Sequence, residues 1–287
     1  MKAPAFTYHD PRSLADLKGL LGTLEIVRLL AGGQSLMPML NMRLTTPDHL
    51  IDLNRIDALA GIELREGKLA IGAMTRQCDL EASPLVRAHC PLLTEALSHV
   101  GHRQTRNRGT FGGSLCHLDP SAELPLVAAV IDATIQIESN RGRRELPMAS
   151  FPVGYLTSAL EPDELMTGAL LPAWPVGHGY AFVEFARRHG DFAVVAVAVL
   201  MTVDGGGRIA RVAIAIGGVG LGPVRVSAAE TLLTGATGAP ERFDAAADLA
   251  GEIESNGDIH ASPAYRQHLA RVLTERALVV AYQRAGN

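Results

Sequence analysis

Hydrophobic and polar residues in the first 53 positions follow a helical pattern and then two short extended patterns. Ser13 is a good helix-capping residue, and the leucines after it (Leu14, Leu17, Leu20 and Leu21) fall on one face of a helix. An apolar run from Ile26 to Leu30 ends abruptly at a glycine-rich segment, and a second run covers Leu50–Leu53. This order predicts a helix, a strand, a glycine-rich loop, a small helix and a second strand.

The central part of the chain combines a hairpin with helices. Residues 61–72 alternate between apolar and polar on both sides of a Glu-Gly pair, which is typical of a β-hairpin. A helical pattern around residues 91–100 precedes a basic, polar segment and a second glycine-rich loop at residues 110–114. A helix is expected at residues 122–130 and a strand at residues 134–138.

A domain boundary is expected near residues 171–175, where two prolines in four residues favour a linker. Beyond it, three extended runs are followed by Ala- and Leu-rich helical patterns, the last from Pro263 to Gln283. The pattern predicts a three-stranded antiparallel sheet followed by helices, with a hairpin turn at Asp204–Gly207. The expected strands are Tyr180–Arg187, Phe192–Val203 and Arg208–Gly217.

Composition is that of an ordinary globular protein, with 47% hydrophobic and 20% charged residues among 287. The formal net charge of −4 argues against a nucleic-acid partner, since phosphate neutralisation needs concentrated Lys and Arg. Two local arginine clusters favour a solvated surface over a functional site. They comprise Arg103, Arg106 and Arg108, and Arg141, Arg143 and Arg144.

Three cysteines, Cys78, Cys90 and Cys116, form no Cys-x-x-Cys pair and cannot complete a four-thiolate site. Their number and spacing favour reduced thiols in a cytoplasmic protein. The first residues lack the apolar stretch of a signal peptide, and the most apolar run, Phe192–Val203, is too short to span a bilayer. We therefore expect a cytoplasmic protein without membrane insertion.

The two glycine-rich loops are the candidate chemistry of this sequence. Paired glycines let a backbone approach a ligand closely, and successive N–H groups can then surround a diphosphate. Ser35, Thr110 and Ser114 would add hydroxyl donors. Either loop alone is also explained by a tight turn. Neither has the spacing of a Rossmann or Walker loop, so a nucleotide here would need a different fold.

At this point the sequence resembles a known family, the flavoprotein subunits of the xanthine dehydrogenase-like molybdenum hydroxylases, including the medium subunits of bacterial carbon monoxide dehydrogenases. Residues 31–44 (AGGQSLMPMLNMRL) resemble the first FAD loop of that family. Residues 110–114 (TFGGS), continuing to DPSAELP at 119–125, resemble the second, and residues 188–193 (RHGDFA) a third segment near the flavin. The resemblance covers essentially the whole chain.

The resemblance implies an α+β fold with a vanillyl-alcohol-oxidase (PCMH) type FAD-binding domain of two subdomains, residues 1–57 and 58–173. A C-terminal flavoprotein domain, residues 174–287, would pack over the flavin side. FAD would be bound non-covalently between the subdomains. Its diphosphate would be wrapped by Ala31, Gly32, Gly33, Gln34 and Ser35, and its diphosphate and ribityl region held by Thr110, Phe111, Gly112, Gly113 and Ser114. Polar cofactor groups would be bound by Asp119 or Glu123, and Arg188 and Phe192 would lie near the isoalloxazine.

Three positions depart from the family pattern. Phe111 stands where relatives usually carry Ile, which could alter shielding of the flavin. Phe192 stands where some carry Tyr, which puts a phenolic role in doubt. His117 lies in a stretch that is often smaller and more polar, and a surface or core histidine is favoured there over a cofactor ligand.

By resemblance, the chain is the electron-relay subunit of a larger enzyme. Electrons would leave the substrate at molybdenum in a large molybdopterin subunit, pass through iron–sulfur clusters in a small subunit, reach FAD here and go to an external acceptor. No classical catalytic residue is needed, because the flavin carries the redox chemistry. Two alternatives stay open: a stand-alone flavin oxidase or dehydrogenase, and a non-catalytic nucleotide-binding module. Gln34 stands where some stand-alone enzymes attach flavin through His or Cys, and its amide cannot form that bond.

Overall fold

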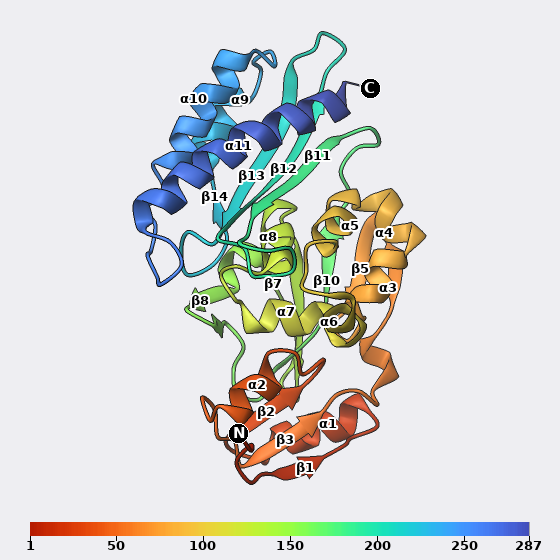
Figure 1. The fold of residues 1–287 in the computed structure, drawn as a ribbon. Helices are drawn as coiled ribbons and strands as arrows, with labels where there is room; N and C mark the ends of the chain where they lie inside the picture. The colour runs from red at the N-terminus through yellow and green to blue at the C-terminus, as the bar shows by residue number, and fades with distance from the viewer. Residues whose placement is uncertain (287) are drawn as a thin grey trace.

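The computed structural model describes residues 1–286 and arranges them as three packed units along the chain (Figure 1). The N-terminal unit is a three-stranded parallel sheet in the order β1-β3-β2. Ser13 caps the first helix by accepting a hydrogen bond from the Asp16 N–H, as expected. The apolar face of that helix packs with Ile51, Leu53 and Leu59 in a small core. The elements are β1 (Thr7–His9), α1 (Leu14–Leu21), β2 (Val27–Leu30), α2 (Leu36–Asn41), β3 (His49–Asp52) and the 3₁₀ turn η1 (Asp57–Leu59).

The second unit is a five-stranded antiparallel sheet in the order β4-β5-β10-β6-β7, covered by six short helices. The hairpin predicted at residues 61–72 is confirmed as β4 and β5. The strands are β4 (Ile62–Arg65), β5 (Lys68–Gly72), β6 (Thr134–Ser139), β7 (Gly142–Pro147) and β10 (Leu165–Pro172), with a separate small hairpin of β8 (Pro152–Gly154) and β9 (Thr157–Ser158). The helices are α3 (Gln77–Ala82), α4 (Pro84–His89), α5 (Pro91–Leu97), α6 (Arg103–Arg108), α7 (Phe111–His117) and α8 (Glu123–Val130), with the 3₁₀ turn η2 (Met148–Ser150).

Two features of this unit differ from the sequence prediction. Strand β10 lies at the centre of the sheet, and it includes Leu171 and Pro172, which we expected to begin a linker. Residues 111–114 form the first turn of α7 instead of a loop, because the Thr110 side chain caps them by accepting from the Gly113 N–H. The low helix propensity of the two glycines is overcome by these contacts.

The C-terminal unit is an antiparallel sheet with three helices on one face (Figure 1). The three long strands and the turn at Asp204–Gly207 are confirmed, but the sheet has a fourth, two-residue strand, so the expected three-stranded description was incomplete. The elements are β11 (Gly179–Phe185), β12 (Val195–Val203), β13 (Ile209–Gly217), β14 (Val224–Arg225), α9 (Ser227–Leu233), α10 (Pro240–Gly251) and α11 (Pro263–Ala285).

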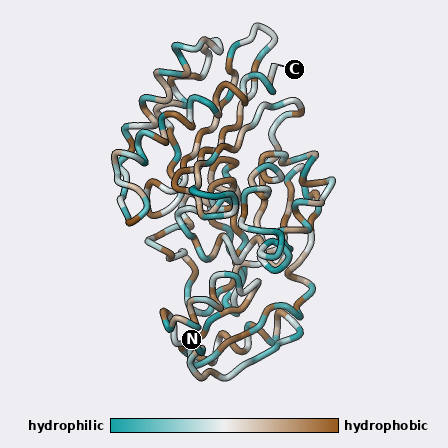
Figure 2. Tube along the Cα trace, viewed as in Figure 1, coloured by the Kyte–Doolittle hydropathy of each residue, from teal (hydrophilic) through white to brown (hydrophobic). Residues whose placement is uncertain are grey.

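Both faces of this C-terminal sheet are buried. Val197 and Val199 pack with the helices of their own unit, whereas Ala198 and Leu200 belong to the core of the second unit. This explains why β12 is almost uninterruptedly apolar, as strands covered on both sides are. Figure 2 shows the hydrophobic segments gathered in the middle of the molecule. Among residues 1–286, no helix has the length and apolar character required to cross a membrane.

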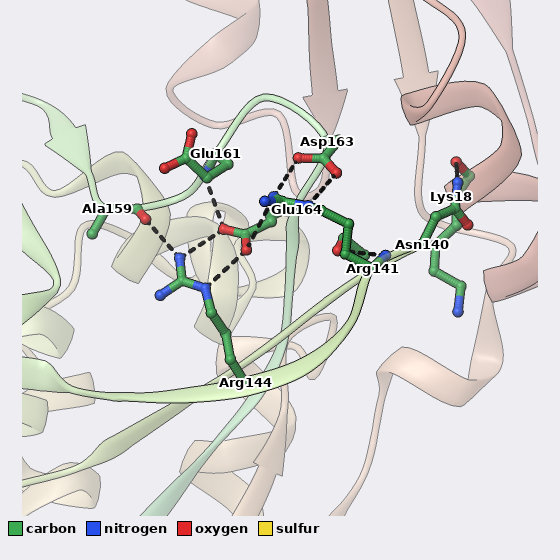
Figure 3. A network of polar contacts seen from close by, with 9 residues as sticks. Lys18, Asn140, Arg141, Arg144, Ala159, Glu161, Asp163 and Glu164 are labelled. Atoms are coloured by element: carbon green, nitrogen blue, oxygen red, sulfur yellow. Dashed lines mark hydrogen bonds and ion pairs between the residues drawn. The ribbon is translucent and has the colours of Figure 1, made fainter.

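On one side, the N-terminal unit is held to the second unit by polar contacts at the β6–β7 hairpin (Figure 3). Asn140 donates to the Lys18 carbonyl at 2.9 Å, and the Lys18 ammonium binds Glu138 at 2.6 Å. The arginine cluster at 141–144 is structural: Arg141 pairs with Asp163, Arg143 with Glu138, and Arg144 with Glu164.

We expect Glu138→Gln to weaken this junction. The hydrogen bond from Lys18 holds the pKa of Glu138 below its usual value, so the pair stabilises the fold above pH 4.5 and less as the pH falls through the lowered pKa. The substitution should lower the free energy of unfolding by about 1–3 kcal/mol at pH 7, and by less at pH 4. Urea unfolding at both pH values measures this. Glu63→Gln, which breaks an exposed pair with Arg65, should change stability by less than about 1 kcal/mol. Equal losses in the two variants would contradict the assignment.

Candidate functional site

The first glycine-rich loop connects β2 to α2 and carries free backbone donors. Within residues 1–286, the N–H groups of Gly32, Gly33, Gln34 and Ser35 donate no hydrogen bond to a protein acceptor. Gly33 has a φ of +73°, which turns the chain here. The loop is partly exposed, so these donors remain available to an anionic ligand. The assignment of this loop to a diphosphate stays a prediction.

The second glycine-rich segment is different, because its amides are already engaged. The N–H groups of Phe111 and Gly112 donate to the carbonyls of Thr75 and Ala73 at 2.9 and 2.8 Å, and that of Gly113 to the Thr110 hydroxyl. These three amides are therefore engaged within the protein, and the predicted role of residues 110–114 in holding the diphosphate and ribityl region stays a prediction. The half-buried Ser114 remains at the surface, where its hydroxyl is a candidate donor.

Phe111 is buried. Its side chain is 1% exposed and belongs to the core of the second unit together with Leu115. The expected effect of this residue on flavin shielding has no support in this placement. His117 is half-buried in the same helix.

The two glycine-rich segments meet at the C-terminal end of α6. A Cβ atom on Gly32 would lie 2.3 Å from the Arg108 carbonyl oxygen and 2.8 Å from the Gly109 Cα. Two residues absent from the sequence prediction hold the segments together: the Asn54 amide donates to the Ala31 carbonyl at 2.9 Å, and the Arg76 guanidinium donates to both Asn54 and the Arg108 carbonyl. Nothing in the local sequence marks either residue, since their role depends on the contact between two distant segments.

The third predicted segment lies at the other end of α6. Arg188 and Phe192 are on the connection between β11 and β12, and both are exposed, Phe192 by 66%. Between them, Gly190 is packed so closely on the residue before α6 that a Cβ atom would lie 2.6 Å from the His102 ring. Helix α6 has six residues, a rise of about 9 Å. The segments around Gly32 and Gly190 are thus placed at its opposite ends, as an elongated ligand would require.

The two acidic residues predicted to bind polar cofactor groups differ in burial. Asp119 is partly exposed and accepts from the Ser121 N–H, whereas Glu123, at the start of α8, is only 6% exposed. Burial raises the pKa of Glu123 to about 8, and the negative charge of Glu184 adds to the shift.

Glu184 is bonded to His99, 3.2 Å away, and this hydrogen bond raises the pKa of the histidine. The Glu184 Oε2 atom is buried without a partner in residues 1–286. Glu123 therefore belongs to a buried acid–histidine cluster between the second and C-terminal units, which the sequence prediction missed.

Comparisons with known proteins identify the family of this chain. A family model described as the FAD binding domain in molybdopterin dehydrogenase matches residues 4–174, and one described as the CO dehydrogenase flavoprotein C-terminal domain matches residues 180–281. The chain belongs to the FAD-binding medium subunits of the molybdenum hydroxylases. It is accordingly an oxidoreductase subunit with an FAD-binding domain.

Similar members of this family are subunits of enzymes named for different substrates. The chain is 40% identical to the nicotine 6-hydroxylase medium subunit of Paenarthrobacter nicotinovorans, covering 98% of this chain and 99% of the relative. It is 38% identical to the 6-hydroxypseudooxynicotine dehydrogenase complex subunit alpha of the same organism, with 99% and 97% covered. A solved structure of carbon monoxide dehydrogenase from Hydrogenophaga pseudoflava matches with a TM-score of 0.96 and 39% identity, covering 99% of both chains. The α+β fold inferred from the sequence is thereby confirmed.

Proposed function

We propose that this medium subunit holds FAD non-covalently along α6 and relays electrons from a partner's iron–sulfur clusters to an external acceptor. The observation that carries the proposal is the free amide row of residues 32–35 at one end of α6, with the exposed 188–192 segment at the other. In this proposal the diphosphate lies at the C-terminal end of α6, beside residues 32–35, and the flavin ring lies toward its N-terminal end, beside residues 188–192.

The residues present suit this cofactor. Free N–H groups in a partly exposed loop are the donors that a diphosphate requires. The Gln34 side chain donates to the Gly32 carbonyl at 3.3 Å and offers no nucleophile for a covalent flavin link. Bound FAD would supply the one- and two-electron chemistry. The chain's own residues would position it: Ser114 beside the diphosphate or ribityl group, and Arg188 and Phe192 at the ring end.

The proposed relay role is supported by the different substrates for which the relatives' enzymes are named. Medium subunits that are about equally similar to this chain serve enzymes named for nicotine and for carbon monoxide. Substrate choice therefore belongs to another subunit. We infer that the partners are a small iron–sulfur subunit and a large molybdopterin subunit, assembled with this chain in the cytoplasm.

A visible absorption spectrum of the purified chain, before and after acid precipitation, tests the cofactor. Flavin bands that move to the supernatant and identify as FAD support non-covalent binding. A colourless chain that takes up no added FAD would refute the proposal.

The relay itself is tested by adding candidate substrates to the chain alone and to the assembled enzyme. We expect the flavin to be reduced only in the assembled enzyme. Turnover by the isolated chain would instead favour a stand-alone oxidase or dehydrogenase.

A further inference from the structure

Arg76 connects three segments at the junction of the first two units. One of its terminal nitrogens donates to the Arg108 carbonyl and the other to the Asn54 side chain, whose amide holds the Ala31 carbonyl. The guanidinium thus lies between the first glycine-rich loop and the end of α6, next to the free amide donors of that loop.

The positive charge of Arg76 and Arg108 is only partly balanced by the protein: Asp52 attracts both guanidiniums and Asp79 attracts Arg76, without forming an ion pair with either. Within residues 1–286, neither Arg76 nor Arg108 forms an ion pair with a carboxylate, whereas Arg106 on the same helix binds Glu81 at 2.8 Å. The nearby Asp52 is engaged by the Tyr8 hydroxyl and by Asn54. Burial, and then the positive charge of Arg108, lower the pKa of Arg76, so the two guanidiniums repel one another.

Two neighbouring like charges that form no ion pair with a carboxylate are stabilised further by an anion that binds between or beside them. The free N–H groups of residues 32–35 lie in the same region, and such a row of donors stabilises an anion more than a neutral group. Guanidiniums bind phosphate oxygens through paired, charge-assisted hydrogen bonds.

We infer that Arg76 and Arg108 form an anion-binding subsite for the diphosphate of the dinucleotide. Arg76 in addition holds the two glycine-rich segments in place around that diphosphate. Arg108 acts through its charge alone. Arg76 acts through its charge and also through its forked guanidinium, which binds two segments at once. The subsite makes the chain select FAD over riboflavin, which has no phosphate. This inference rests on the proposed function.

The test is calorimetric titration of the full-length, FAD-free chain with FAD, ADP, FMN and riboflavin. Arg108→Gln and Arg76→Gln should each weaken FAD and ADP binding by about ten- to a hundredfold, the range for a charge-assisted hydrogen bond, and leave riboflavin binding unchanged. Added salt should weaken FAD binding less in Arg108→Gln than in the wild type. Arg87→Gln is the matched control, because Arg87 is exposed on α4 and makes no ion pair in the described chain.

Lysine variants separate the two roles. Arg108→Lys should restore most of the FAD affinity, because it keeps the charge, whereas Arg76→Lys should not, because one ammonium cannot reproduce the fork to Asn54 and Arg108.

Wild-type FAD affinity in Arg108→Gln, or an equal loss of riboflavin and FAD binding, would overturn the inference. Arg108 is exposed, so its variants stay informative even if Arg76→Gln does not fold. A wild-type chain that binds none of the four ligands would instead refute the proposed function.

Discussion

Replacing Gly32 with alanine should weaken FAD retention by about tenfold to a hundredfold. The added Cβ atom would lie 2.3 Å from the Arg108 carbonyl oxygen and 2.8 Å from the Gly109 Cα. Both are backbone atoms, so no side-chain rotation relieves the overlap and the two glycine-rich segments must move apart. Overpacking of this kind costs about 1–3 kcal/mol. If this cost lowers the free energy of FAD binding, it corresponds to the expected loss of affinity.

The measurement is FAD affinity by fluorescence titration, together with urea unfolding of the FAD-free chain. Gly19→Ala is the matched control, since it makes the same change in the same unit. A Cβ atom there has nothing within 4 Å, and alanine within α1 should stabilise the chain by about 0.5–1 kcal/mol without changing FAD affinity. Wild-type FAD affinity in Gly32→Ala would mean that the meeting point of the two segments is not the cofactor site.

The sequence was sufficient where local signals determine structure. The cap at Ser13, the hairpin at 61–72 and the long strands of the C-terminal sheet follow from side-chain periodicity and turn residues. Strand β10 could not be found in this way. Its central place depends on pairing with β5 and β6, and its final Pro172 is a residue that normally marks a strand end or a linker.

The same division applies to the site. The glycine-rich loop at 31–35 could be recognised from residue types and from family resemblance. The engaged amides of residues 111–113 could not, because their acceptors, Ala73 and Thr75, lie in another part of the chain. The role of Arg76 is hidden for the same reason. Helix α6 carries no glycine signature, yet it determines the spacing between the first loop and the segment around Gly190.

Glu123→Gln should remove a large part of the pH dependence of stability. Glu123 is almost fully buried, and its pKa of about 8 in the fold compares with 4.5 for an ordinary glutamate. Between these values the unfolded chain loses a proton that the folded chain keeps, so stability falls as the pH rises from about 4.5 to about 8. The difference corresponds to a loss on the order of 5 kcal/mol across the window. The groups that act on Glu123 are Glu184, His99 and Asp119.

His99 contributes in the same direction. Its pKa is raised by the hydrogen bond to Glu184, so its stabilising effect is complete below pH 6.5 and is lost as the pH rises through the raised value. Glutamine at position 123 resembles the protonated acid and cannot ionise. Urea unfolding of the FAD-free chain should therefore give nearly equal stability for wild type and Glu123→Gln at pH 5, and a more stable variant at pH 8.5. Glu241→Gln, an exposed change on α10, should follow the wild type at both pH values. If Glu123→Gln gained no stability relative to wild type at pH 8.5, Glu123 would be ionised at little cost in the fold, and the buried cluster would not be the origin of the pH dependence.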